Sequence, residues 1–66
     1  MKNTVKVERA KKDMTQQELA DSLSVSRQTI IAIESGKFNP SVKLALKIAS
    51  FFGCDVRELF LLEDGD

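Results

Sequence analysis

The sequence predicts an all-α fold of five short helices, and three observations support that prediction. Apolar residues recur at spacings of three and four through most of the 66-residue chain. Ser, Thr or Asp residues suited to a helix N-cap precede three of these segments. Glycines at positions 36 and 53 stand directly after two of them, where helices commonly end. We treat residues 1–66 as one domain, because a chain this short supports only one core.

The segment 15–36 predicts two helices separated by a tight turn. Thr15 and Glu18 have the spacing of a capping box, in which each side chain accepts a hydrogen bond from the other residue's backbone N–H. The apolar residues that follow share one helical face: Leu19, Ala20 and Leu23. The pattern then breaks at residues 24 and 25, which predicts the turn.

A second helix start follows this break. Ser26 offers a new N-cap, and Gly36 suits the end of the helix. The inner face of this helix is supplied by Ile30 and Ile33. Arg27 and Gln28 are then its first side chains, and they point away from the core. Two helices in this arrangement can lay the second helix in the major groove of DNA.

The N-terminal segment predicts a short arm and the first helix. Residues 1–4 are polar and suit an extended arm, and residues 5–12 form a basic helix with Val5 and Arg9 on its inner side. Asp13 ends this helix, since Asp tolerates the left-handed conformation better than most residues.

A fourth, strongly apolar helix is predicted over residues 41–52. Pro40 marks its start. Its polar positions form a single stripe, and all others are apolar, which predicts a helix buried on most sides. Gly53 ends it.

The C-terminal segment 55–66 predicts a short helix followed by an apolar and acidic tail. Asp55 and Glu58 repeat the capping-box spacing and open a helix through residue 60. Leu61 and Leu62 could form a strand that pairs with residues 2–5, and they could pack across a two-fold axis. We expect both. An exposed tail is the remaining alternative, although contiguous apolar patches are uncommon on monomers. The expected dimer interface comprises Phe51, Phe52, Leu59, Phe60, Leu61 and Leu62.

Charge is distributed unevenly although the net charge is zero. Residues 1–47 hold nine basic and five acidic residues, a net charge of +4, whereas residues 48–66 carry −4. The asymmetry fits either a DNA-facing side with an acidic side turned away or a chance clustering of solvated charges. No apolar run has the length of a membrane span and no signal peptide is recognisable, so we expect a cytoplasmic protein.

The composition argues against an enzyme. The chain contains no His, Tyr or Trp, one Cys and no Gly-rich phosphate loop. We therefore expect no catalytic residues, no cofactor and no metal site. Cys54 cannot form an internal disulfide and is interpreted as a small apolar packing residue, with a redox-active thiol as the alternative.

The residues from Val5 to Phe60 resemble the Cro/lambda-repressor-like, XRE-type helix-turn-helix family. The likeness lies in T-Q-x-E-L-A-x-x-L-x-V-S-R-Q-T-I-x-x-I-E-x-G-K-F-N-P-S, followed by L-A-L-K-I-A. The resemblance implies a five-helix DNA-binding domain that is often a homodimer, in some members with a short antiparallel sheet formed by the two termini. It also implies an ion pair between Arg9 and Glu34 that joins the first helix to the end of the third.

The resemblance further implies which residues meet double-stranded DNA. Arg27 suits the O6/N7 edge of guanine and Gln28 the N6/N7 edge of adenine. The implied base contacts are Arg27, Gln28, Ile31 and Ala32. The implied phosphate contacts are Gln16, Gln17, Thr29, Lys37, Asn39, Ser41 and Lys43. A homodimeric repressor on a near-palindromic operator is expected, without a small-molecule effector. An autorepressing antitoxin and an interaction module that has lost DNA binding are the alternatives.

Two residues depart from the family pattern. Ser24 stands in the turn, where the family usually has Gly at positive φ, and keeping that geometry strains the backbone. Ile31 stands where a polar residue is common on the outer face of the recognition helix. Ile31 either contacts a thymine methyl group or points inward.

Overall fold

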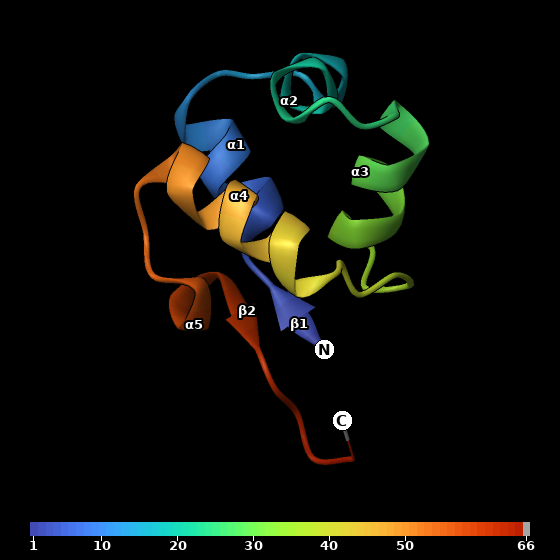
Figure 1. The fold of residues 1–66 in the computed structure, drawn as a ribbon, viewed down its shortest axis with the longest axis vertical. Coiled ribbons are helices and arrows are strands. Elements are labelled where there is room, and N and C mark those ends of the chain that lie inside the picture. Colours follow the sequence, from blue (N-terminus) through green and yellow to red (C-terminus); the bar gives the residue numbers. More distant parts are fainter. Residues whose placement is uncertain (66) are drawn as a thin grey trace.

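The computed structural model describes residues 1–65 and consists of five helices with a small two-stranded sheet (Figure 1). This confirms the predicted fold class and the sheet between the termini. Asp66, the last residue of the predicted acidic tail, lies outside the described residues. In chain order the elements are β1 (Lys2–Asn3), α1 (Val5–Lys11), α2 (Gln16–Leu23), α3 (Arg27–Glu34), α4 (Val42–Phe52), α5 (Val56–Leu59) and β2 (Phe60–Leu61).

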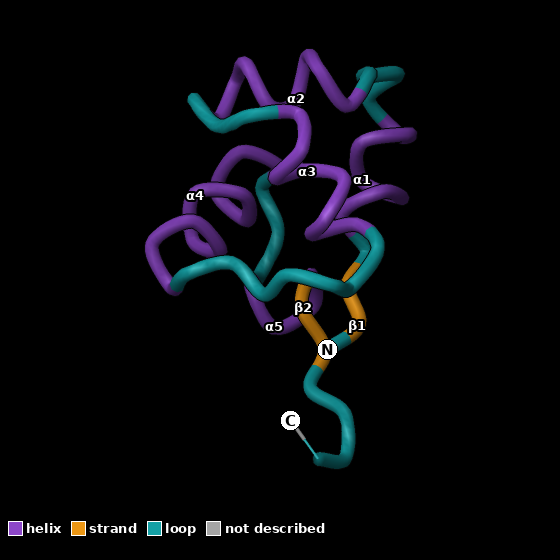
Figure 2. Tube along the Cα trace, turned by 90° about the vertical axis from the view of Figure 1, so that its right-hand side faces the viewer, coloured by secondary structure: helices purple, strands orange, loops and turns teal. Residues whose placement is uncertain are grey.

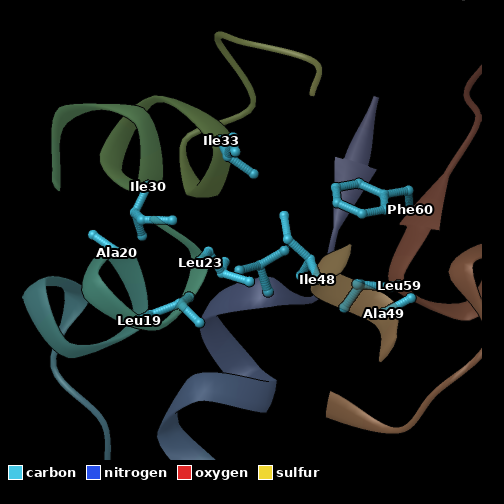
Figure 3. Packing of buried hydrophobic residues seen from close by; sticks show 10 residues of the cluster. Leu19, Ala20, Leu23, Ile30, Ile33, Ile48, Ala49, Leu59 and Phe60 are labelled. Carbon is cyan, nitrogen blue, oxygen red and sulfur yellow. The ribbon is translucent and has the colours of Figure 1, made fainter. Parts of the chain in front are cut away.

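The core joins the inner faces of all five helices and of β2. Helices α2 and α3 cross steeply, and their buried faces meet side chains from α4, α5 and β2 (Figures 1 and 3). Burying each large aliphatic side chain contributes roughly 1.5–3 kcal/mol. The core is therefore built on the residues predicted for the inner faces of α2 and α3. The buried apolar set is Val5, Leu19, Ala20, Leu23, Ile30, Ile33, Ile48, Ala49, Leu59 and Phe60.

The first four helices end in the same way. Each is followed by a residue with positive φ: Asp13 at 53°, Ser24 at 58°, Gly36 at 78° and Gly53 at 69°. In each case this residue and the next donate backbone N–H bonds to carbonyls of the preceding turn, the pattern of a Schellman motif. All four predicted helix ends are confirmed, including the strained conformation of Ser24.

The two termini pair as a short antiparallel sheet. Lys2 lies opposite Leu61 and Asn3 opposite Phe60, and the ladder continues as the N–H of Thr4 donates to the carbonyl of Leu59 at 2.9 Å. The strand begins one residue earlier than predicted, so Leu62 lies beyond it. Figure 2 shows the sheet at the opposite end of the molecule from α2.

Helix α4 is not buried on most sides, and that prediction was wrong. Only Ile48 and Ala49 are buried, whereas Val42 is 77% and Leu46 52% exposed. The physical reason is size, since a chain this short has too few elements to surround a central helix. Figure 1 shows α4 on the near side of the molecule, with no element in front of it.

Helix α5 begins with a single cap rather than the predicted capping box. The carboxylate of Asp55 accepts the backbone N–H of Arg57 at 2.8 Å and also holds its guanidinium at 3.1 Å. The helix has only four residues and ends at Leu59, so Phe60 belongs to β2. The Asp55 carboxylate is thus engaged by Arg57 rather than by the N–H of Glu58, which donates instead to the Asp55 carbonyl at 3.0 Å.

Candidate nucleic-acid interface

The exposed N-terminus of α3 presents Arg27 and Gln28. Ser26 caps this end, because its Oγ accepts the backbone N–H of Thr29 at 3.2 Å and lies 3.0 Å from the Thr29 hydroxyl. Arg27 and Gln28 are exposed, and neither side chain hydrogen-bonds to any of residues 1–65. Two polar side chains able to make bidentate hydrogen bonds are therefore held at a fixed helix start without an internal partner.

The N-termini of α2 and α3 open onto one shallow hollow of about 520 Å³. Arg27 lies on its rim, and within residues 1–65 the backbone N–H groups of Gln16 and Gln17 have no acceptor. Free N–H groups in the first turn of a helix suit a phosphate or another anion. The hollow is lined by Arg9, Thr15, Gln16, Gln17 and Arg27.

The side-chain amides of the two glutamines are used within the protein. Gln16 is half-buried and donates through Nε2 to Oε1 of Glu34 at 3.2 Å. Gln17 is exposed and donates to Oδ1 of Asp21 at 2.9 Å. The predicted phosphate role thus rests on the backbone at Gln16, whereas the exposed Gln17 amide is free to exchange its partner.

Arg9 and Glu34 form the ion pair that the resemblance implied. Nε of Arg9 lies 2.8 Å from Oε2 of Glu34 and Nη2 lies 3.2 Å from Oε1, a bidentate arrangement. A third donor, Nη1, reaches the carbonyl of Met14 at 2.7 Å. The two side chains are 15% and 5% exposed, and the hydrogen bonds that Arg9 donates to Glu34 raise the pKa of the Arg9 guanidinium above its ordinary value. This pair ties α1 and the end of α3 together behind the exposed face.

The outer face of α3 carries Ile31. Its side chain is 36% exposed and borders a small hollow with Lys6 and Gln16, so Ile31 points outward and the inward alternative is wrong. Ala32 is half-buried, and its carbonyl accepts the N–H of Lys37 at 3.0 Å. Only part of the Ala32 methyl surface is therefore open to a ligand.

The remaining candidate phosphate contacts are not gathered in one place. Lys37 and Asn39 are exposed in the loop after α3, at the far end from Arg27. Ser41 caps α4, its Oγ accepting the N–H of Leu44 at 3.1 Å. Lys43 borders a different, apolar groove of about 460 Å³ beside the end of α2, so the structure separates it from the hollow at the helix starts.

The predicted dimer residues divide into buried and exposed groups. Leu59 is fully buried and Phe60 is 8% exposed, so both belong to the protomer's own core and offer no surface to a partner. The prediction that Leu59 and Phe60 belong to the dimer interface was therefore wrong. The rest of the predicted set keeps some exposure, partial for Phe52 and larger for Phe51 at 37%, Leu61 at 43% and Leu62 at 81%.

Comparison with known proteins agrees with this geometry. The helix-turn-helix family model matches residues 5–59. An uncharacterized HTH-type transcriptional regulator of Methanocaldococcus jannaschii is 56% identical over 66 residues, which is 100% of both chains. The uncharacterized HTH-type transcriptional regulator YgzD of Bacillus subtilis is 44% identical over 64 residues, 97% of each chain. The chain belongs to the XRE-type helix-turn-helix family. It is a transcriptional regulator, and members of this family bind DNA and are not enzymes.

A more distant relative is named for repression. The cryptic phage CTXphi transcriptional repressor RstR of Vibrio cholerae is 33% identical over 51 residues, covering 77% of this chain and 46% of that protein. Separately, none of the helices within residues 1–65 combines the length and the apolar character that crossing a bilayer requires.

Cys54 lies at the end of α4, away from the helix-turn-helix. It packs half-buried against the core, and burial, followed by the carboxylates of Glu8, Glu58 and Asp55, raises the pKa of its thiol. A raised pKa lowers the thiolate fraction near neutral pH and with it the reactivity. These features favour the interpretation of Cys54 as a packing residue.

Two polar contacts that brace the helix-turn-helix were missed by sequence reasoning. Asn3 donates through Nδ2 to the carbonyl of Ile33 at 2.8 Å, and Nζ of Lys47 donates to the carbonyl of Leu23 at 3.3 Å. Both satisfy carbonyl groups near helix C-termini, where donors and positive charge are favoured. The partners are 30 and 24 residues apart, so no local spacing signals them.

Proposed function

We propose that this regulator is a sequence-specific, homodimeric transcriptional repressor that reads a near-palindromic operator by placing α3 in the major groove. One observation carries the proposal. The start of α3 holds two exposed side chains without partners among residues 1–65, Arg27 and Gln28, on a helix braced by a largely buried ion pair. We propose that it acts in the cytoplasm as one domain spanning residues 1–66.

Base recognition is assigned to the outer face of α3. Arg27 donates two hydrogen bonds to guanine O6 and N7, and Gln28 pairs with adenine N6 and N7. Ile31, exposed on the same helix, contacts a thymine methyl group, and Ala32 contributes a smaller apolar contact. Each good bidentate pair discriminates against the wrong base by roughly 1–3 kcal/mol.

Phosphate contacts surround this face at both ends of α3. The unpaired N–H groups at the start of α2 and the Gln17 amide bind one phosphate at the hollow. Lys37 and Asn39 bind another beyond the end of α3, because both are exposed there. Four of the phosphate contacts implied by the family resemblance contribute less, because they already have internal roles or lie elsewhere. They are Gln16, Thr29, Ser41 and Lys43.

Dimerisation follows from the size of the contact. One such domain buries too little DNA surface for tight specific binding, whereas a two-fold dimer presents two recognition helices roughly 34 Å apart. Leu61 and Leu62 are consecutive and both exposed, and Phe51 is exposed near the end of α4. We propose that they form the dimer interface. The name of the RstR relative supports repression, and no named relative supports the antitoxin alternative.

The test is selection of bound duplexes from a random pool, followed by titration of the selected site and of random DNA at several salt concentrations. Arg27→Ala should weaken the selected site by roughly 5–150-fold, corresponding to about 1–3 kcal/mol, and largely spare random DNA. Lys37→Ala should weaken both and reduce the salt slope by about 1. Arg57→Ala, which removes an exposed arginine from α5, is the matched control and should change neither.

The selected sequences test the dimer as well. Half-site centres about 10–11 bp apart are expected, because each protomer should meet the same face of the duplex. A lone half-site without symmetry would contradict the proposed dimer. Loss of binding to all DNA in Arg27→Ala, equal to that of Lys37→Ala, would contradict base reading by Arg27.

A further inference from the structure

We propose that Asn3 is a positioning residue for the recognition helix. By holding the C-terminal end of α3 against the terminal sheet, it fixes the direction in which Arg27 and Gln28 point. The inference rests on the proposed DNA-binding function and deepens it, since Asn3 itself lies at the end of α3 away from the bases.

The Asn3 amide bridges two backbone segments. Its Nδ2 donates to the carbonyl of Ile33 at 2.8 Å, and its Oδ1 accepts the N–H of Val5 at 3.2 Å. The first bond engages the last turn of α3 and the second engages the first turn of α1. Because both partners are backbone groups, the amide constrains the helices themselves rather than side chains that could change rotamer.

The carbonyl of Ile33 accepts two hydrogen bonds at the C-terminal end of α3. Besides the bond from Asn3, it accepts the N–H of Gly36 at 3.0 Å as part of the helix ending. Asn3 therefore supplies a second donor to an oxygen with two lone pairs, which satisfies it fully. The side chain of Ile33 is buried in the core, so the same residue is held from both its side chain and its backbone.

Asn3 is itself held in place by the sheet. It pairs with Phe60 in the ladder, and the neighbouring Thr4 N–H bonds to the carbonyl of Leu59. Phe60 and Leu59 are core residues, so the backbone of Asn3 is held by strand pairing to a segment that is itself fixed in the core. Figure 1 shows α3 descending from α2 toward β1, which places the anchored end beside the sheet and the reading end away from it.

The length of α3 turns a small tilt into a loss of base contact. Eight residues span roughly 12 Å, so a tilt of about 5° at the anchored end displaces the first turn by about 1 Å. Hydrogen bonds to base edges tolerate only a few tenths of an ångström around 2.9 Å, and binding sites lose function at displacements of about this size. Loss of the Asn3 bond should therefore reduce discrimination between sequences more than it reduces attraction to phosphate.

The experiment compares Asn3→Asp and Asn3→Ala with the native protein. Asn3→Asp keeps the acceptor for the Val5 N–H but sets an oxygen against the Ile33 carbonyl, and Asn3→Ala removes both bonds without adding charge. Gly53→Ala is the control, since a Cβ at φ of 69° strains the end of α4 and lowers stability, yet it would meet no atom within 4 Å and leaves α3 and the terminal sheet unaltered. All four proteins are titrated with the selected operator and with random duplex, at a temperature where circular dichroism shows each to be folded.

We expect both Asn3 variants to lose about tenfold in the ratio of operator to random-DNA affinity, within the range of one base contact. Gly53→Ala should keep the native ratio. The ratio also removes the effect of the added negative charge in Asn3→Asp, which acts on both kinds of DNA. An equal loss of ratio in Gly53→Ala would overturn the inference, because it would show that stability alone sets discrimination.

A measurement without DNA completes the test. In the native protein, NMR should detect a scalar coupling across the hydrogen bond between Asn3 Nδ2 and the Ile33 carbonyl carbon, and its absence would overturn the inference. If the native protein shows no sequence preference, the proposed function fails and the role of Asn3 fails with it. If the native protein discriminates and both variants keep its ratio, only the role of Asn3 fails.

Discussion

The helix-turn-helix and the C-terminal part of the chain treat their apolar side chains in opposite ways. In α2 and α3, the one large apolar side chain with substantial exposure is Ile31, at 36%. From α4 to the end of the described residues, five large apolar side chains are exposed. They are Val42, Leu46, Phe51, Leu61 and Leu62.

The polar interactions of the two regions also differ. The helix-turn-helix is stabilised by a capping box at Thr15, a second cap at Ser26 and a largely buried ion pair at Glu34. Helix α5 has four residues and an ion pair with Arg57 that is largely in solvent. In the helix-turn-helix, the apolar side chains are largely buried within the protomer and the exposed face is polar, which suits contact with DNA. The C-terminal part keeps exposed apolar surface, which we propose a second copy of the chain covers.

The largest expected effect comes from breaking the internal bracing of the helix-turn-helix. Arg9→Ala leaves the carboxylate of Glu34, 5% exposed, with Gln16 as its remaining side-chain donor. Removing one partner of a buried pair lowers the free energy of unfolding by roughly 3–5 kcal/mol. Urea denaturation followed by circular dichroism measures the change.

The control for this variant is an exposed pair in α1. Lys11 lies 3.0 Å from Glu8, with its side chain 66% exposed, so Lys11→Ala should change stability by at most about 1 kcal/mol. If Arg9→Ala is no more destabilising than Lys11→Ala, the ion pair does not brace the helix-turn-helix.

The next effect concerns the apolar C-terminal surface. Leu62 is 81% exposed in the protomer, so Leu62→Ser should leave the folded protomer intact. A dimer that buries this side chain would lose roughly 1.5–3 kcal/mol per protomer. Sedimentation velocity across protein concentrations should show a dimer for the native chain and a shift toward monomer for the variant.

Val7→Ser is the matched control, because Val7 is 53% exposed on α1 and lies outside the proposed interface. It should leave the dimer unchanged. A native chain that sediments as a monomer at all concentrations would remove the proposed dimer and, with it, this account of the exposed apolar surface.

The smallest expected effect concerns backbone strain in the turn between α2 and α3. Ser24 has φ of 58° and an exposed side chain. Ser24→Gly relieves the left-handed strain but gives the unfolded chain more freedom, so the expected net gain is about 0.5–1 kcal/mol. For a domain of this size that raises the melting temperature by roughly 2–8 °C, measured by calorimetry, and the selected DNA site should not change.

The same substitution two residues earlier tests the reasoning. Ser22 lies inside α2, where φ is helical and Gly is unfavourable, so Ser22→Gly should lower the melting temperature. A lower melting temperature for Ser24→Gly would contradict the strain argument.

Most local features of the fold could be predicted from the sequence. The capping box at Thr15, the cap at Ser26 and the left-handed ends at Asp13 and Ser24 all follow the predictions. Each depends on residues within one helical turn, where spacing specifies geometry directly. The predicted outward position of Arg27 follows from the same local logic.

Apart from the local capping box predicted at Asp55 and Glu58, which is replaced by a single cap, the errors concern features that depend on surroundings. The apolar sequence of α4 suggested burial, yet Val42 and Leu46 are exposed because the small chain has nothing left to cover them. Leu59 and Phe60 were assigned to a partner surface, but the short α5 and the sheet turn them into the core. Composition states how apolar a helix is and not how much of it the rest of the chain can surround.

The sequence by itself determined where the first four helices start and stop and that Arg27 and Gln28 open an exposed helix, since these follow from interactions within a few residues. Only the tertiary structure decided that Asn3 reaches Ile33, that Gln16 joins the Arg9–Glu34 pair and that α4 keeps an open apolar face. These contacts join segments 18 to 30 residues apart, and such contacts exist only once packing has brought the segments together.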